Sequence, residues 1–275
     1  PANYNVIFSP HKAEFFRTDG YIDTHMEVIV SPERNAEVRR ISLTNHGRQP
    51  VEVEVTSYFE VVLSQYGADI AHPAFSKLFV QTEYVDEHES LLCVRRPRIP
   101  EQKPIWLVHT TALEGEGIGG IQFETDRMRF IGRDRTTGNP VSVEINHPLS
   151  GTAGAVLDPI MSLRRRVMIK PGTAARLSFT MGVANSRDEA IALADEYRDP
   201  RVVERALELA WTHSQVELKY MNLTTNQVNV IQQMGSRIMY PGQLLRYRKE
   251  YIAQNKKGQP GLWGYGISGD IPIVI

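Results

Sequence analysis

The sequence is poor in cysteine, has no long apolar run and carries no excess of charge of either sign. Its 275 residues include one cysteine, and 31 basic side chains face 32 acidic ones. A single cysteine excludes an internal disulfide and a cysteine-based zinc site. No stretch approaches the roughly 18 apolar residues that span a bilayer, and a balanced charge provides no field that attracts nucleic acid. We therefore expect no nucleic-acid partner and no direct membrane insertion of this segment.

The cysteine, the histidines and the arginine run of this sequence are more typical of structural roles than of functional sites. Cys93 lies in an apolar run and is typical of a small buried hydrophobe. Three histidines are scattered without the spacing of metal ligands: His11, His72 and His109. The arginine run 164–166 lies in a predicted strand, where neighbouring side chains point apart, so an exposed strand face is favoured over a phosphate pocket. We predict no metal site, no cofactor and no catalytic residue in this segment.

Alternation of apolar and polar side chains dominates residues 1–185. The clearest segment runs from Val51 to Leu63, which predicts one long strand with one dry face. Connectors rich in turn formers predict two antiparallel hairpins, which pair 38–44 with 51–63 and 166–169 with 175–183. Further strands are predicted at 21–30, 75–84, 89–95, 105–112, 121–130 and 154–161. About ten strands with short connectors favour a mainly β fold, a large antiparallel β-sandwich.

Helical signals replace this alternation after residue 185. Ser186 begins a capping box, Asp199 precedes a proline in the first position of a second helix, and Thr224 begins a third. These signals predict helices from 186 to about 197, from 200, and from 224 to about 240. The chain is therefore divided into a sandwich domain (1–185), a helical linker (186–242) and a junction (243–275) that leads into a further domain.

Several phrases in a fixed order resemble one enzyme family: SPHKAEF (9–15), TSYFEVVL (56–63), AHPAFSKLFV (71–80), GAVLDPI (154–160), RALELAW (205–211) and GLWGYGISGDIPIV (261–274). Together they are similar to glycoside hydrolase family 94, formerly glycosyltransferase family 36. Within that family they resemble the phosphorylase-like region of cyclic β-1,2-glucan synthases. The resemblance covers nearly the whole segment, and no single phrase is a catalytic signature.

The resemblance implies a galactose-mutarotase-like supersandwich, then a helical linker, then a downstream (α/α)6 barrel of the same chain that carries the general-acid aspartate. This segment is therefore expected to lack the catalytic acid. The implied substrate is a β-glucan or oligosaccharide, with inorganic phosphate as co-substrate of the parent enzyme. Phosphorolysis would release glucose 1-phosphate and control the chain length of β-1,2-glucan. The parent chain is expected at the inner membrane, with this segment on the cytoplasmic side.

The last phrase holds the candidate substrate-binding residues: Trp263, Tyr265, Ser268 and Asp270. Aromatic faces suit pyranose rings, an aspartate accepts hydrogen bonds from sugar hydroxyls, and the interleaved glycines allow close approach. Asp270 is the strongest candidate, as a binding residue and not as the acid. The alternative interpretation is a glycine-rich domain junction with packed aromatic side chains.

Three functions stay open at this point. The segment is a non-catalytic part of a glucan phosphorylase or synthase, a glycan-binding module, or a purely structural module of a large carbohydrate-active protein. A soluble phosphorylase is the alternative parent to the synthase. The apolar run 271–275 predicts that more chain follows, and that residues 262–275 present an apolar patch.

Overall fold

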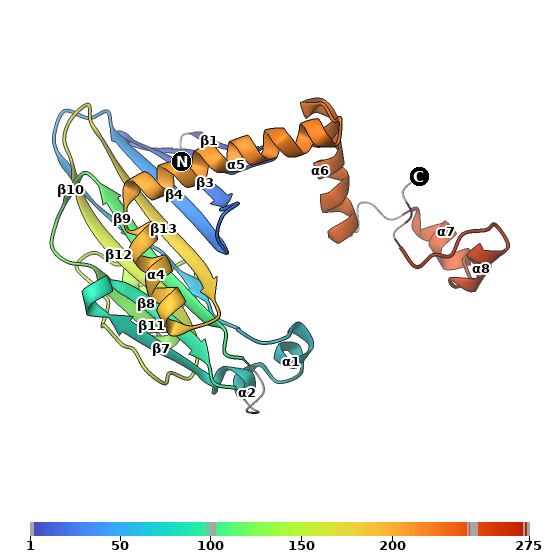
Figure 1. The fold of residues 1–275 in the computed structure, drawn as a ribbon, viewed down its shortest axis with the longest axis horizontal. Coiled ribbons are helices and arrows are strands. Elements are labelled where there is room, and N and C mark those ends of the chain that lie inside the picture. Colours follow the sequence, from blue (N-terminus) through green and yellow to red (C-terminus); the bar gives the residue numbers. More distant parts are fainter. Residues whose placement is uncertain are drawn as a thin grey trace. The chain divides into compact units, whose positions relative to one another are not determined.

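The structure is a computed structural model that describes residues 3–97, 99, 103–240, 242, 247–271 and 273. The chain divides into two compact units, residues 1–215 and 216–275 (Figure 1). The predicted domain limits at residues 185 and 242 stay predictions.

Strands make up most of the first unit: β1 (Asn3–Phe8), β2 (Ala13–Asp19), β3 (Ile22–Val30), β4 (Ala36–Asn45), β5 (Val51–Thr56), β6 (Phe59–Glu60), β7 (Val80–Val85), β8 (Ser90–Arg95), β9 (Trp106–Glu114), β10 (Glu116–Gly117), β11 (Gln122–Asp126), β12 (Pro159–Ile169) and β13 (Ala174–Ala184). Short helices lie between them: α1 (Tyr66–Ala71), α2 (Pro73–Lys77), η1 (Asp86–His88), α3 (Arg127–Ile131) and η2 (Val141–Val143). Helices follow the last strand: α4 (Arg187–Tyr197), α5 (Pro200–Tyr220), α6 (Thr225–Met239), α7 (Lys249–Gln254) and α8 (Pro260–Trp263).

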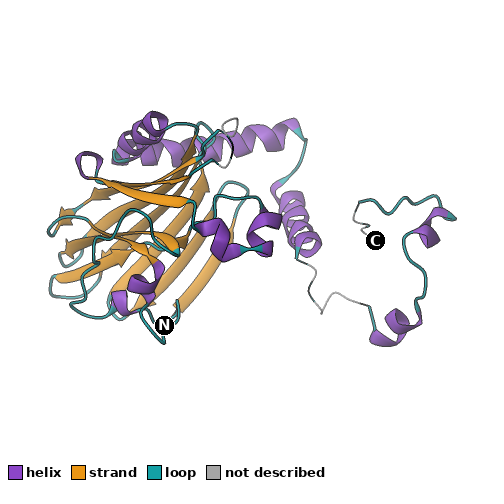
Figure 2. Cartoon of the chain, turned by 90° about the horizontal axis from the view of Figure 1, so that it is seen from below, coloured by secondary structure: helices purple, strands orange, loops and turns teal. Residues whose placement is uncertain are grey.

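Two antiparallel sheets form the first unit, and they confirm the mainly β sandwich. The larger sheet has eight strands in the order β1-β2-β3-β4-β13-β9-β8-β7. The smaller sheet has five strands and is built around β12, which pairs with β5, β6, β10 and β11. Figure 2 shows the strands gathered in curved layers, with the helices outside them.

Both predicted hairpins are wrong, because each predicted pair divides between the two sheets. β4 pairs with β3 and β13 in the larger sheet, whereas β5 pairs with β12 in the smaller one. In the same way, β12 and β13 belong to different sheets. The turn at Pro171 and Gly172 is itself correct, since Gly172 has φ 70°, as a type II turn requires. The two connectors, 46–50 and 170–173, are therefore corners where the chain crosses from one sheet to the other.

Asn45, at the end of β4, is fully buried and joins the two corners. Its Nδ2 donates to the carbonyl of Ile169 at 2.9 Å and to a carbonyl in its own corner, while Oδ1 accepts from the N–H of Gly47 at 2.8 Å. Its backbone donates to Thr173 at 3.1 Å and accepts from Gly172 at 2.8 Å. One residue thus satisfies backbone groups of both crossovers, which ordinary ladders cannot reach.

The predicted long strand from Val51 to Leu63 is interrupted after Thr56. The N–H of Leu163 donates to Oγ of Ser57 at 3.0 Å, and Oγ of Ser162 donates to the Ser57 carbonyl at 2.7 Å. Two hydroxyls therefore replace one backbone ladder bond. The register on β12 is the same on both sides of the break, so the predicted alternation of faces persists through it.

Three other predicted strands begin or end elsewhere. Residues 75–84 start as helix α2, because Pro73 occupies its first position, and the strand begins at Val80. Residues 121–130 leave the sheet at Asp126, whose side chain caps α3. The strand predicted at 154–161 begins later, at Pro159, where β12 starts. Within 154–158, Gly154 forms an isolated bridge to Thr82.

The helical prediction is confirmed at its caps. Ser186 accepts from the N–H of Glu189 at the start of α4, although the Glu189 carboxylate reaches back to Asn185 and not to Ser186. Asp199 accepts from the N–H of Arg201 at the start of α5, and Thr224 begins α6 with a complete capping box. Caps of this kind satisfy N–H groups that a helix leaves unpaired.

Apolar clusters hold the layers together. One lies between the sheets and includes Cys93, Leu163 and Phe179, which confirms Cys93 as a buried residue. A second lies between the larger sheet and helices α4 and α5, which cover its outer face (Figure 1). α4 approaches β13 at Gly182, where a Cβ atom would overlap Leu193. Glycine is therefore required at that contact.

Replacement of Asn45 by alanine should lower the free energy of unfolding of the first unit by about 3 kcal/mol, because buried backbone groups of both corners lose their partners. Guanidinium denaturation measures the change. Asn5→Ala, on the exposed edge strand β1, is the control and should change stability by no more than about 0.5 kcal/mol. Equal effects of the two substitutions would contradict the role given to Asn45.

Candidate functional site

The predicted substrate-binding residues lie in the second unit. Trp263 ends α8, and Tyr265, Ser268 and Asp270 lie on the loop after it. Three of them gather around Gln259, whose Nε2 donates to Oδ1 of Asp270 at 2.7 Å and to the carbonyl of Ser268 at 3.0 Å. The indole N–H of Trp263 donates to the same Ser268 carbonyl at 3.2 Å. Trp263, Ser268 and Asp270 therefore form one small polar loop, held by Gln259.

The hydrogen bonds of this polar loop do not include the side chain of Tyr265. Tyr265 is 78% exposed, and Trp263 is 62% exposed. The loop turns at Gly269, which has φ 73° and where a Cβ atom would lie 2.9 Å from Leu262. The two aromatic faces and the Asp270 carboxylate are available to a ligand, and their role in sugar binding stays a prediction.

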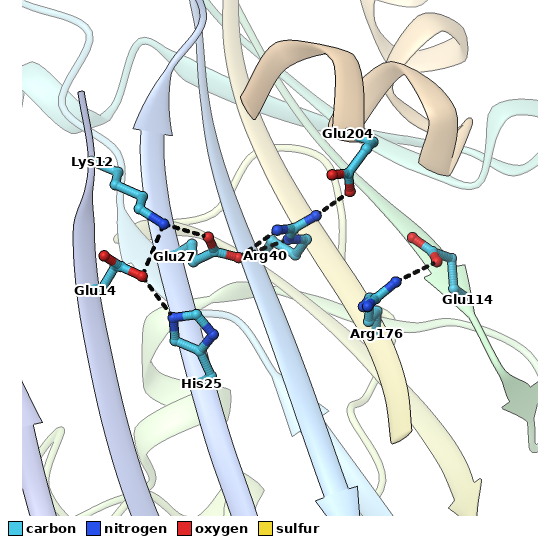
Figure 3. A network of polar contacts seen from close by, with 8 residues as sticks. All are labelled: Lys12, Glu14, His25, Glu27, Arg40, Glu114, Arg176 and Glu204. Carbon is cyan, nitrogen blue, oxygen red and sulfur yellow. Dashed lines mark hydrogen bonds and ion pairs between the residues drawn. The ribbon is translucent and has the colours of Figure 1, made fainter. Parts of the chain in front are cut away.

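A charged network crosses the outer face of the larger sheet (Figure 3). Nζ of Lys12 lies 2.9 Å from a carboxylate oxygen of Glu14 and 2.9 Å from one of Glu27. Glu27 also binds Arg40 at 2.6 Å, and Arg40 reaches Glu204 on α5. The network thus links strands β2, β3 and β4 to the helix that lies over them.

Part of this network has the residue types of a metal site. Ligand atoms of Glu14, His25 and Glu27 lie within 4.8 Å of one another. The Lys12 ammonium, however, contacts both carboxylates, and His25 Nε2 lies 3.1 Å from Glu14 (Figure 3). The positive charge that two carboxylates require is therefore supplied by the protein itself.

Glu27 is the buried centre of this network. Its burial opposes ionisation, but hydrogen bonds from Lys12 and Arg40, together with their charges, outweigh that cost and hold the pKa of Glu27 below its ordinary value. Glu27 is thus an ionised carboxylate on which three strands converge.

A cavity of about 310 Å³ opens on the inner face of the larger sheet, within the first unit. Apolar and aromatic side chains from both sheets form most of its wall: Met26, Ile41, Tyr58, Phe59, Phe179 and Met181. Its polar lining residues are Glu37, Arg39, Thr56, Ser57 and His109. Sequence patterning placed all of these residues except Glu37 on strands but gave no sign that they would leave a space between the sheets.

His109 lies in the wall of this cavity and binds Ser57, 52 positions away in the sequence. Nδ1 of His109 lies 3.0 Å from the Thr180 carbonyl, which can only accept, so this nitrogen carries the hydrogen. Nε2 is then the acceptor, and the hydroxyl of Ser57 donates to it at 2.7 Å. The structural role expected for His109 is confirmed by its burial and its two hydrogen bonds, and Ser57 is the partner that sequence reasoning missed.

A serine that donates to an oriented histidine has the geometry of an activated nucleophile. Burial, however, lowers the pKa of His109 to about 4, well below the value that suits a general base at neutral pH. The Ser57 oxygen also accepts from the N–H of Leu163. The pair therefore fastens one sheet to the other and gives the cavity a rigid wall.

For the arginine run 164–166, the predicted exposed strand face is wrong at Arg164, whereas the predicted divergence of the side chains agrees with the structure. Arg164 is 1% exposed, so the expected exposed face is wrong there. It donates to Oγ1 of Thr56 at 2.8 Å and to two loop carbonyls, because the loop 142–147 folds over this strand. Arg165 instead lies near Glu89 and Arg166 binds Glu52, so the three guanidinium groups do not converge on one anion.

Two antiparallel sheets joined by crossovers at buried corners, with helices over one outer face, form a large β-sandwich. Residues 1–200 match the family model for the glycosyl hydrolase 94 supersandwich domain. The chain belongs to glycosyl hydrolase family 94.

One relative aligns along almost the whole chain. It is cyclic β-(1,2)-glucan synthase NdvB of Rhizobium meliloti (strain 1021), 37% identical over 267 residues, which are 97% of this chain and 9% of the relative. The chain thus spans a small fraction of the curated relative it matches.

Solved structures give weaker similarities. A bacterial glucoamylase bound to acarbose aligns with a TM-score of 0.43 and 12% identity, over 77% of this chain and 28% of its own. A polysaccharide lyase aligns with a TM-score of 0.38 and 16% identity, over 66% and 23%. In the described part of the chain, no helix combines the length and apolarity needed to cross a membrane.

Replacement of Glu27 by glutamine should destabilise the protein at pH 7 by about 2 kcal/mol, since Lys12 and Arg40 lose their shared anion. Because the folded-state pKa of Glu27 is depressed, its contribution is present above the ordinary value of 4.5 and is lost as the pH falls through the folded value. Denaturation at several pH values should therefore show a flatter acid limb in Glu27→Gln. Glu114→Gln, in an exposed pair with Arg176, is the control that should leave the limb unchanged.

His109 should also make stability depend on pH. Its folded-state pKa of about 4 lies below the ordinary 6.5, so its contribution is present above pH 6.5 and is lost as the pH falls toward 4. The loss amounts to about 3 kcal/mol. His109→Gln should remove this component, whereas His46→Gln, at an exposed ion pair, should retain it. An imidazole signal of His109 that titrates near pH 6.5 would contradict the assignment.

Proposed function

We propose that this chain is the N-terminal supersandwich and following helical segment of a β-glucan-processing glycosyltransferase or phosphorylase, in which it supports phosphorolysis and chain-length control of β-1,2-glucan. The observation that carries the proposal is the 37% identity to a cyclic β-(1,2)-glucan synthase along 97% of the chain. The family model for residues 1–200 supports the same class of enzyme.

The chemistry of the proposed reaction assigns this chain a supporting role. Inverting cleavage requires one carboxylic acid that protonates the leaving oxygen, while the nucleophile attacks the opposite face of the sugar. With inorganic phosphate as nucleophile, a second carboxylate base is not required. The acid is proposed to lie in a downstream (α/α)6 barrel, and Trp263, Tyr265, Ser268 and Asp270 to contact the glucan. The parent chain is proposed to sit at the inner membrane with this unit on its cytoplasmic side.

The test is release of glucose 1-phosphate from β-1,2-glucan in the presence of phosphate. The chain alone should be inactive, and a protein extended through the downstream barrel should be active, because only the extended protein contains the acid. Activity of the chain alone, or inactivity of both proteins, would contradict the proposal.

Asp270 provides a finer test in the extended protein. Asp270→Ala should lower kcat/KM by about tenfold, through the loss of one hydrogen bond to a sugar hydroxyl. Glu250→Ala removes an exposed acid from α7 of the same unit and should leave kcat/KM unchanged. Equal values of kcat/KM for the two variants would show that Asp270 does not bind the glucan.

A further inference from the structure

We infer that the cavity between the two sheets is a glucosyl-binding subsite, so that the sandwich itself holds part of a glucan. The inference rests on the proposed function for the identity of the sugar. It concerns a place in the first unit that is distinct from the loop bearing Asp270.

The first observation is that the protein leaves this space unfilled. Protein interiors pack to crystal density, and voids lined by apolar side chains reduce stability. A volume of about 310 Å³ lies at the lower end of the range for small-molecule pockets, about 300–1,000 Å³. A ligand of one or two sugar rings is the size that such a space suits.

The second observation is the composition of the wall. Phe59 and Phe179 lie against His109, with ring centroids 4.9 Å and 5.9 Å from it. These ring contacts, edge-to-face for Phe59 and stacked for Phe179, together with the Ser57 hydrogen bond, provide a rigid aromatic surface. Met26 and Met181 provide adaptable surface elsewhere, since methionine side chains adjust to irregular shapes. Aromatic and apolar surface suits the C–H face of a pyranose.

The third observation is the charge of the polar lining. Among its described lining residues, Glu37 and Arg39 are the charged ones at neutral pH, because buried His109 is uncharged. Nε of Arg39 lies 2.7 Å from Oε1 of Glu37. Their charges cancel, so the cavity offers no net attraction to an ion. It offers a donor and an acceptor side by side, which is what neighbouring hydroxyl groups require. A neutral polyhydroxylated ring fits better than an anion or a hydrocarbon.

A second cavity in the same unit shows the contrast. It measures about 380 Å³ and lies between the end of β13, the β3–β4 connection and α4. Its described lining includes Glu33, Glu189 and Glu196, with one arginine and no aromatic side chain. It therefore lacks the surface on which a sugar ring stacks.

Methionine methyl groups allow a direct test. The chain is labelled with ¹³C at the methionine methyls and titrated with sophorose, the β-1,2-linked disaccharide of glucose. Met26 and Met181 line the cavity, whereas Met128 is an exposed residue of α3. We expect the signals of Met26 and Met181 to shift saturably with the same dissociation constant, in the millimolar range. The signal of Met128 should not shift.

Two matched variants connect the shifts to the cavity. Arg39→Gln removes the donor at the rim and should weaken sophorose binding about tenfold, which corresponds to about 1.4 kcal/mol. Arg176→Gln removes an arginine of similar exposure, also paired with a glutamate, on the opposite face of the same sheet, and should leave binding unchanged. Both side chains are about half exposed, so neither variant should impair folding.

The outcomes separate this inference from the proposed function. No saturable shift of Met26 and Met181 up to about 50 mM sophorose, or binding that Arg39→Gln does not weaken, overturns the subsite. The extended protein can still release glucose 1-phosphate in that case, which keeps the proposed function. Saturable binding in the cavity together with an inactive extended protein keeps the subsite and removes the phosphorolytic role.

Discussion

The fold depends on the hydrogen bonds of one buried amide. A chain that leaves one sheet to join another breaks its ladder at the corner, and the backbone groups there need other partners. Asn45 supplies them for two corners at once: its side chain binds Gly47 and Ile169, and its backbone binds Gly172 and Thr173. The sandwich consequently has its two sheets tied at one end, while the cavity lined by Met26 and Met181 opens elsewhere between them.

The sequence predicts which side chains share a face, but it does not predict which strands share a sheet. The alternation from Val51 to Leu63 survives the break at Ser57, because two serine hydroxyls replace a ladder bond without a change of register. The corners after Asn45 and before Ala174 have the composition of hairpin turns. A turn motif predicts that the chain reverses direction. Which sheet the next strand joins depends on contacts between residues more than a hundred positions apart, such as Asn45 and Ile169. Helix caps are local, so Ser186 and Thr224 were predicted correctly.

The candidate sites show the same limit. Trp263, Ser268 and Asp270 are near neighbours in the sequence, and the structure gathers them around Gln259. Ser57 lies between two strands of the smaller sheet, His109 lies on the larger sheet, and the two are 52 positions apart, so their spacing in the sequence could not predict the contact. Arg164 was predicted to be exposed because the loop that covers it is not encoded in the strand pattern. The cavity is a shape left between two sheets, and alternation describes each sheet separately.

The position of β13 has a consequence for how the protein is made. This strand lies between β4 and β9 in the larger sheet, although it is the last strand to be synthesised. Asn45 therefore leaves the ribosome 124 residues before Ile169, its partner in the opposite corner. At usual rates of translation the edge of β4 stays open for on the order of ten seconds. During that interval the unpaired edge of β4 can pair with a strand of another chain, and charged side chains on an edge strand, such as Glu37, Arg39 and Arg40 of β4, disfavour that pairing.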